Sequence, residues 1–190
     1  METQLTSTEK QTLLKLARQA LESGVRGNIP TPLREAELSP ALRANGASFV
    51  TLTRRGQLRG CIGALEGYQP LAQDVQEHAV AAALNDYRFP PVAPDELDEI
   101  KIEISRLTPP QPLHYTDSAD LLAKLRPNID GVTLRDKFGR RATFLPQVWQ
   151  QLPDKAEFLS HLCQKMGTSP DAWRSQNLTV QTYQVEEFHE

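Results

Sequence analysis

The residues best suited to chemistry lie in the run LRGCIG at positions 58–63, which holds one of the two cysteines of the chain. In a β-strand the side chains alternate between two faces, so Arg59 and Cys61 are expected on one face, about 7 Å apart. A guanidinium at that range favours a thiolate, which a nucleophilic or anion-binding cysteine requires. Gly60 and Gly63 leave the backbone open to a ligand. The run therefore predicts a site with Cys61 and Arg59 as catalytic residues. The alternative is that Cys61 packs as a small apolar residue.

Three further polar side chains are candidates for binding a ligand beside Cys61. Glu66 follows the strand in a loop, where it either reaches the ligand or remains a solvated carboxylate. Asp86 and Arg88 stand just before two prolines. They either join Cys61 in the site or form an ion pair that pins the loop. His78 falls outside the apolar stripe of its helix, so we expect a surface histidine rather than a catalytic base.

No cofactor or metal is predicted from the sequence. The spacing of cysteines and histidines matches no zinc site, and the three clustered cysteines that a radical-SAM iron–sulfur cluster requires are missing. The chain also has no phosphate-binding loop and no dinucleotide fingerprint. We therefore expect any chemistry to come from the side chains themselves.

Composition limits the possible partners and the compartment. The chain has 190 residues, of which 39% are hydrophobic and 24% charged, with a net charge of -3. A general nucleic-acid binder would carry a basic excess, so nucleic acid is not an expected partner. No apolar stretch is long enough to cross a membrane, and the polar start is no signal peptide. Two distant cysteines favour reduced thiols and a cytoplasmic location.

The first half of the chain contains the elements that must position Cys61. Thr6 and Glu9 form a capping-box pattern that starts a helix, with Gly24 as its expected end. Residues 48–53 and 58–62 alternate as two strands joined by the turn at 54–57, which predicts a β-hairpin. A helix over 70–84 and a strand over 99–107 follow.

The second half adds short elements without a regular βαβ rhythm. Cys163 lies on a helix at apolar spacing and is expected in a core. The predicted elements are helices at 121–125 and 154–166 and strands at 132–134, 141–144 and 178–188. This order favours an α+β fold, with a mainly antiparallel or mixed sheet packed with helices.

Three separated motifs carry a family resemblance: LRGCIG at 58–63, DYRFPP at 86–91 and FLPQVW at 144–149. With them the chain resembles the AMMECR domain family, whose prokaryotic members are called AmmeMemoRadiSam system protein A. The resemblance implies one AMMECR-type α+β domain over residues 1–190, built from a larger and a smaller closely packed subdomain. It also implies that the RGCIG segment is the functional site, and that Memo-like and radical-SAM proteins are partners.

Two functional hypotheses follow. In the first, the protein is a small cytoplasmic enzyme that uses Cys61 with Arg59 for nucleophilic or group-transfer chemistry on a small anionic substrate. In the second, it is a non-catalytic binding or accessory module that works with Memo-like and radical-SAM partner proteins. There, Cys61 contributes only size and shape.

Overall fold

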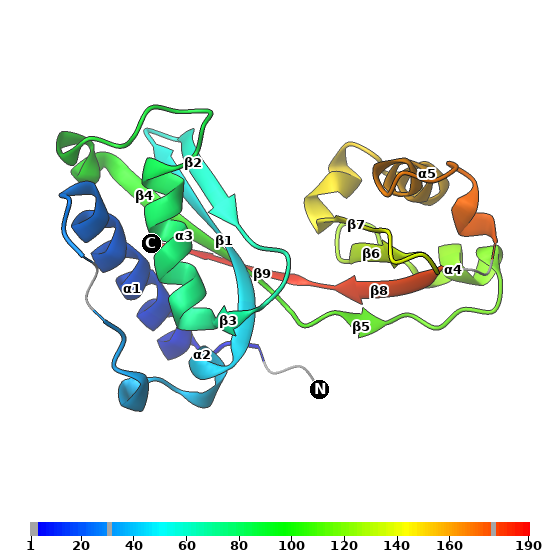
Figure 1. Cartoon of the computed structure of the whole chain (residues 1–190), viewed down its shortest axis with the longest axis horizontal. Helices are drawn as coiled ribbons and strands as arrows, with labels where there is room; N and C mark the ends of the chain where they lie inside the picture. Colours follow the sequence, from blue (N-terminus) through cyan, green and yellow to red (C-terminus); the bar gives the residue numbers. More distant parts are fainter. Residues whose placement is uncertain (1–3, 30–31, 176–177) are drawn as a thin grey trace. The chain divides into compact units, whose positions relative to one another are not determined.

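The computed structural model describes residues 4–29, 32–175 and 178–190, and the chain divides into two compact units. Unit 1 comprises the chain up to Thr108 together with Glu186–Glu190, and unit 2 comprises Pro109–Val185. Each unit has its own sheet, its own helices and its own core (Figure 1). The LRGCIG run lies in unit 1.

Unit 1 contains a five-stranded sheet with the strand order β2-β1-β4-β9, in which β3 also pairs with β1. β1 and β2 form the predicted hairpin, and Arg55 and Gly56 at its tip both have positive φ, as the tight turn requires. β2 lies at the edge of the sheet. The strands are β1 (Asn45–Arg54), β2 (Gln57–Gly63), β3 (Gln69–Pro70), β4 (Ile100–Leu107) and β9 (Val185–His189).

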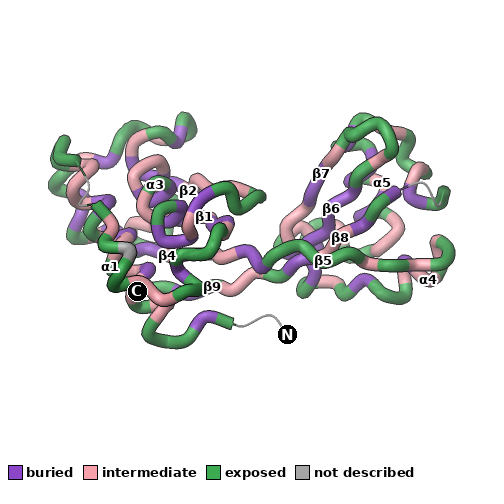
Figure 2. Tube along the Cα trace, turned by 60° about the horizontal axis from the view of Figure 1, so that its bottom comes forward, coloured by how far each residue is buried: buried purple, intermediate pink, exposed green. Residues whose placement is uncertain are grey.

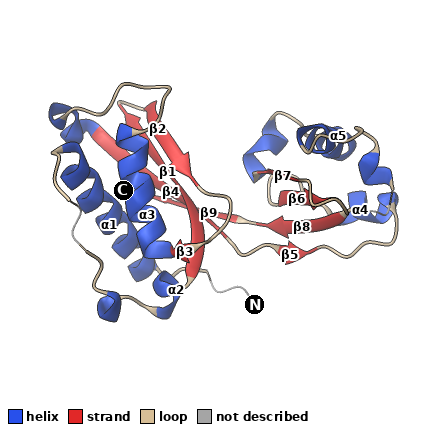
Figure 3. Cartoon of the chain, viewed as in Figure 1, coloured by secondary structure: helices blue, strands red, loops and turns tan. Residues whose placement is uncertain are grey.

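Helices α1 (Ser7–Val25) and α3 (Leu71–Leu84) cover one face of this sheet (Figures 1 and 3). The core lies between these helices and the sheet. The capping box between Thr6 and Glu9 is confirmed. The helix continues past the expected end at Gly24, and the left-handed residue that follows it is Gly27. Shorter helical segments are α2 (Pro40–Arg43), η1 (Glu35–Glu37) and η2 (Pro94–Glu99). The buried sheet residues of this core include Val50, Leu52, Ile100, Ile102 and Ile104.

Unit 2 has a four-stranded antiparallel sheet with the order β5-β8-β6-β7. Its core contains both tryptophans, and Trp149 stacks on Phe158 with 3.6 Å between ring centroids. Cys163 is fully buried there, as predicted, and the purple core of each unit is visible in Figure 2. The elements are β5 (Gln111–Pro112), α4 (Ser118–Lys124), β6 (Gly131–Arg135), β7 (Arg141–Phe144), η3 (Pro146–Gln150), α5 (Lys155–Lys165), η4 (Ala172–Arg174) and β8 (Thr179–Tyr183).

The C-terminal extended segment differs from its prediction. The sequence predicts one strand over 178–188, but the structure divides it into β8, in the sheet of unit 2, and β9, in the sheet of unit 1. Alternating side chains indicate an extended backbone but not the partner of each half. The predicted α+β class is confirmed, with two antiparallel sheets and helices packed on them. Within the described ranges, no helix combines the length and apolarity that a membrane crossing needs.

Candidate functional site

Cys61 lies in edge strand β2, directly opposite Thr51 of β1. Its side chain is half-buried, and the Thr51 hydroxyl Oγ1 donates a hydrogen bond to its sulfur at 3.2 Å. Neighbouring Gly60 points to the other face, because a Cβ there would lie 2.0 Å from the carbonyl oxygen of Ala82 in α3. Cys61 therefore occupies the face of the hairpin opposite the helices.

A β-bulge interrupts the strict alternation that the sequence predicts for β2. Leu58 pairs with Thr53, and Gly60 pairs with the next residue, Leu52, so Arg59 is an extra residue in the strand. A bulge re-aims the side chains next to it. Leu58, which precedes the bulge and pairs with Thr53, is 43% exposed.

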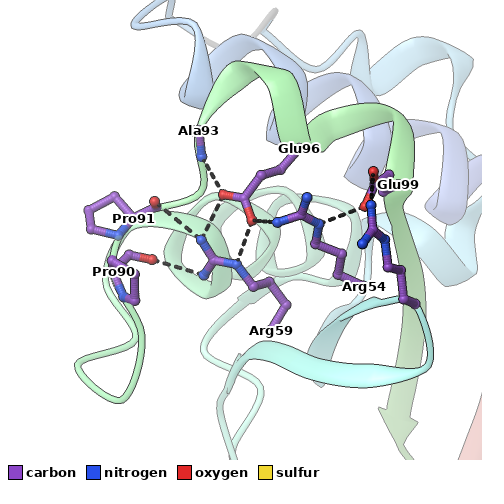
Figure 4. A network of polar contacts seen from close by, with 8 residues as sticks. Arg54, Arg59, Pro90, Pro91, Ala93, Glu96 and Glu99 are labelled. Carbon is purple, nitrogen blue, oxygen red and sulfur yellow. Dashed lines mark hydrogen bonds and ion pairs between the residues drawn. The ribbon is translucent and has the colours of Figure 1, made fainter.

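The guanidinium of Arg59 is hydrogen-bonded to residues other than Cys61. Nε and Nη2 donate to the two carboxylate oxygens of Glu96 at 2.9 and 2.8 Å. Nη1 and Nη2 also donate to the carbonyl oxygens of Pro90 and Pro91 (Figure 4). All three guanidinium nitrogens thus fix the segment 90–96 beside the hairpin.

Glu96 joins the elements around Arg59. Besides Arg59, it accepts hydrogen bonds from Arg54 at 2.9 Å and from the N–H of Ala93 at 2.8 Å (Figure 4). The hydrogen bonds from Arg59 lower the pKa of Glu96 to about 2, and Ala93 and Arg54 make smaller contributions in the same direction. Burial acts in the opposite direction and raises this pKa. Glu99 in turn binds Arg54 and Arg55. The three arginines of the hairpin, Arg54, Arg55 and Arg59, are therefore all paired with carboxylates of the same unit.

Asp86 and Arg88 do lie at Cys61, but they contact its main chain. The buried Asp86 carboxylate accepts the N–H of Cys61 at 2.9 Å, and Arg88 Nη2 donates to the Cys61 carbonyl at 3.2 Å. Arg88 also binds both oxygens of Asp86, at 2.9 and 2.6 Å. This hydrogen bonding by Arg88 holds the pKa of Asp86 well below its usual range. The pair thus satisfies edge groups of β2 that would otherwise be open to another strand.

The two glycines of the run have a packing role that the prediction did not anticipate. As described above, Gly60 lets α3 approach the strand closely. A Cβ at Gly63 would lie 2.4 Å from both the Ser48 carbonyl oxygen and the Phe49 ring. At both positions the space that a Cβ would need is therefore taken by the protein's own atoms.

The two other candidates, Glu66 and His78, lie outside strand β2. Glu66 is exposed in the loop between β2 and β3. His78, expected at the surface, is buried, and its Nδ1 lies 3.1 Å from Oδ2 of Asp74. The Ser48 hydroxyl donates to the same oxygen at 2.6 Å. The spacing of Asp74 and His78, four residues apart on one helix, is the signal that the sequence analysis missed.

The contacts of Cys61 define what the site can do. The sulfur is half-buried beside a hydroxyl donor, and the nearby guanidinium groups are bonded to carboxylates. Over the described ranges, no group of three or more histidine, cysteine, aspartate and glutamate side chains is placed to hold a metal ion. Both cysteines are free thiols. The arrangement can present a thiol and a rigid loop to a binding partner.

Fold and site together define an α+β protein with an LRGCIG edge strand held by an aspartate–arginine pair. Comparison with known proteins agrees: residues 14–188 match the AMMECR1 family. A protein of Methanothermobacter thermautotrophicus is 40% identical over 187 residues, covering 98% of this chain and 96% of the relative. A protein of Thermofilum pendens is 37% identical over 203 residues, covering 98% of this chain and 92% of the relative.

A solved structure is similar as well. The crystal structure of the uncharacterised protein PH0010 from Pyrococcus horikoshii matches with a TM-score of 0.78 at 31% identity, covering 98% of this chain and 93% of that chain. This chain belongs to the AMMECR1 family, which confirms the resemblance found in the three sequence motifs.

Proposed function

We propose that this protein is a non-catalytic binding module that recognises a partner protein with the loop beside Cys61. The observation that carries the proposal is the exposure of Tyr87 on a loop that the fold holds in place. The Tyr87 side chain is 95% exposed. Its neighbours Asp86 and Arg88 are both hydrogen-bonded to the main chain of Cys61, and the N–H of Phe89 bonds to the carbonyl of Asp86 at 3.0 Å.

A tyrosine held in this way suits protein recognition. Tyrosine is enriched among the residues that dominate binding energy at interfaces, because its ring buries a large area and its hydroxyl stays bonded. The loop is already fixed, so binding costs little additional conformational entropy. In this proposal Cys61 contributes shape, and Asp86 and Arg88 position the loop.

The family resemblance suggests which partners to test. It implies Memo-like and radical-SAM proteins, so we propose that the Tyr87 loop contacts one of them. Each protein from the same organism is used as tagged bait, and recovery of this chain is measured. We expect Tyr87→Ala to abolish recovery and Cys61→Ser to retain it.

Tyr68 provides the matched control, because it is a second tyrosine of unit 1 with a 64% exposed side chain. Tyr68→Ala is expected to be recovered like the unaltered protein. Undiminished recovery of Tyr87→Ala, or equal loss with both variants, rejects the loop as the contact. Recovery of the unaltered chain by neither bait rejects these partners.

A second candidate function is the enzyme hypothesis, with Cys61 attacking a small anionic substrate. The Thr51 hydroxyl favours it, because its hydrogen bond holds the sulfur in one orientation. Free Cys61 and Cys163 fit a reducing compartment such as the cytoplasm. The test follows the rate of Cys61 alkylation against pH in the unaltered protein and in Thr51→Val. A profile equal to that of N-acetylcysteine in both proteins refutes catalysis by a Thr51-activated thiol.

A further inference from the structure

A groove of about 570 Å³ lies on unit 1, along the residues of α3 that do not face the core. Cys61 is not among its lining residues, so the groove is separate from the site described above. Pro32, Leu33 and Leu38, from the segment that follows α1, also line it. The Ser39 hydroxyl donates to Glu9 Oε1 at 2.6 Å, so this segment ends next to the first turn of α1.

The floor of the groove is apolar. Leu33 and Leu38 from the segment and Val80 and Ala81 from α3 all line it, and all four side chains are half-buried. Small-molecule sites have this character, with volumes of roughly 300–1,000 Å³, mostly apolar walls and a few placed polar groups. The groove has room for a small ligand with an apolar body.

Among the described side chains that line the groove, two are charged, and they differ in their contacts. Both carboxylate oxygens of Glu77 already accept hydrogen bonds, from Gln69 Nε2 at 2.9 Å and from Gln73 Nε2 at 3.0 Å. Arg43 is exposed in the last turn of α2. Among the side chains that the structure describes, its guanidinium has no hydrogen-bond or ion-pair partner. Of the two charged side chains, the one without a partner is thus the cationic donor, and the side-chain amides of Gln76 and Asn85 also line the groove.

We propose that this groove binds a small carboxylic acid with an apolar body. The carboxylate pairs with the guanidinium of Arg43, whose planar fork of N–H donors matches two carboxylate oxygens. The apolar body covers Leu33, Leu38 and Val80. This ligand pairs with Arg43, which has no partner among the described side chains, and it leaves the Glu77 hydrogen bonds intact.

Three probes of equal chain length test the proposal: hexanoate, 1-hexanol and hexylammonium. Each is titrated into the ¹⁵N-labelled full-length protein while backbone amide shifts are recorded. We expect hexanoate to shift the amides of Val80 and Ala81 and to bind about tenfold more tightly than hexanol, as one charge-assisted contact allows. Hexylammonium is expected to bind most weakly. Equal affinities for the three probes, or tighter binding of hexylammonium, overturn the proposal.

Variants assign the contact to the groove. Arg43→Gln is expected to lower hexanoate affinity about tenfold and to leave hexanol affinity unchanged. Arg26→Gln is the matched control, because Arg26 is also exposed but pairs with Glu22 outside the groove. Ala81→Leu fills the groove and is expected to abolish binding of all three probes, while the remaining amide spectrum confirms folding. Unchanged hexanoate binding in either Arg43→Gln or Ala81→Leu refutes the site.

Discussion

The substitution Glu96→Gln tests whether Arg59 serves the fold rather than Cys61. The Glu96 side chain is 11% exposed and the Arg59 side chain 13%. Glutamine keeps one acceptor oxygen but removes the negative charge, so the mostly buried guanidinium loses its counter-ion. Removing one partner of a buried pair costs more than the pair itself contributes, because the other charge is left without compensation.

The magnitude follows from the pKa of Glu96, which falls from the ordinary 4.5 to about 2 in the folded protein. A difference of this size corresponds to about 3 kcal/mol of stability. Glutamine still accepts one of the hydrogen bonds, which offsets part of this loss, so we expect about 2 kcal/mol. We therefore predict that Glu96→Gln lowers the free energy of unfolding by about 2 kcal/mol at pH 7.

The pH dependence gives the sign of the effect. The folded-state pKa of Glu96 is lower than its unfolded-state value, so its contribution is complete above about pH 4.5. It is lost as the pH falls towards about 2, where the folded carboxylate also takes up a proton. The stability difference between the unaltered protein and Glu96→Gln should shrink steadily over this interval.

Urea unfolding followed by circular dichroism measures the difference between pH 7 and pH 3. Glu37→Gln is the control, because the Glu37 side chain is 67% exposed in a surface pair and should contribute less than about 1 kcal/mol. Circular dichroism is used because tryptophan fluorescence would follow the unfolding of unit 2. Trp149 and Trp173 both lie in that unit, whereas Glu96 lies in unit 1. A Glu96→Gln effect no larger than that of Glu37→Gln, or one independent of pH, refutes a structural role for this ion pair.

Three further predictions concern the LRGCIG strand and the two thiols. Gly60→Ala should destabilise the protein by about 3 kcal/mol or more in urea unfolding, because the new Cβ would overlap a helix carbonyl 2.0 Å away; a loss below about 1 kcal/mol contradicts this packing. Iodoacetamide should modify half-buried Cys61 in the native protein, whereas fully buried Cys163, whose thiol pKa is raised by burial, should react only after unfolding. Mass spectrometry that finds native Cys163 modified first contradicts the prediction. Asp86→Asn should speed hydrogen exchange of the Cys61 amide about tenfold, since it weakens the bond that protects this N–H; an unchanged rate shows that the Asp86 bond does not protect it.

Local patterns predicted much of unit 1 correctly. Thr6 and Glu9 satisfy each other's backbone groups within one turn, so the start of α1 is readable from four residues. The hairpin is also local, because its tight turn joins two adjacent strands. For Asp86 and Arg88 the sequence left two alternatives open, a place in the site or an ion pair that pins the loop. In the structure they form the ion pair and hydrogen-bond the main chain of Cys61.

The sequence by itself determined the family, the α+β class and most of the helices and strands, because these depend on short-range spacing and on three recognisable motifs. Only the tertiary structure decided the surroundings of Cys61. Arg59 is turned to Glu96, which lies 37 residues away in the chain, and a bulge in β2 breaks the alternation that placed its side chain beside the thiol. Periodicity is a property of neighbouring residues, so the residues around Cys61 carry no signal for a contact with a residue this distant in the sequence.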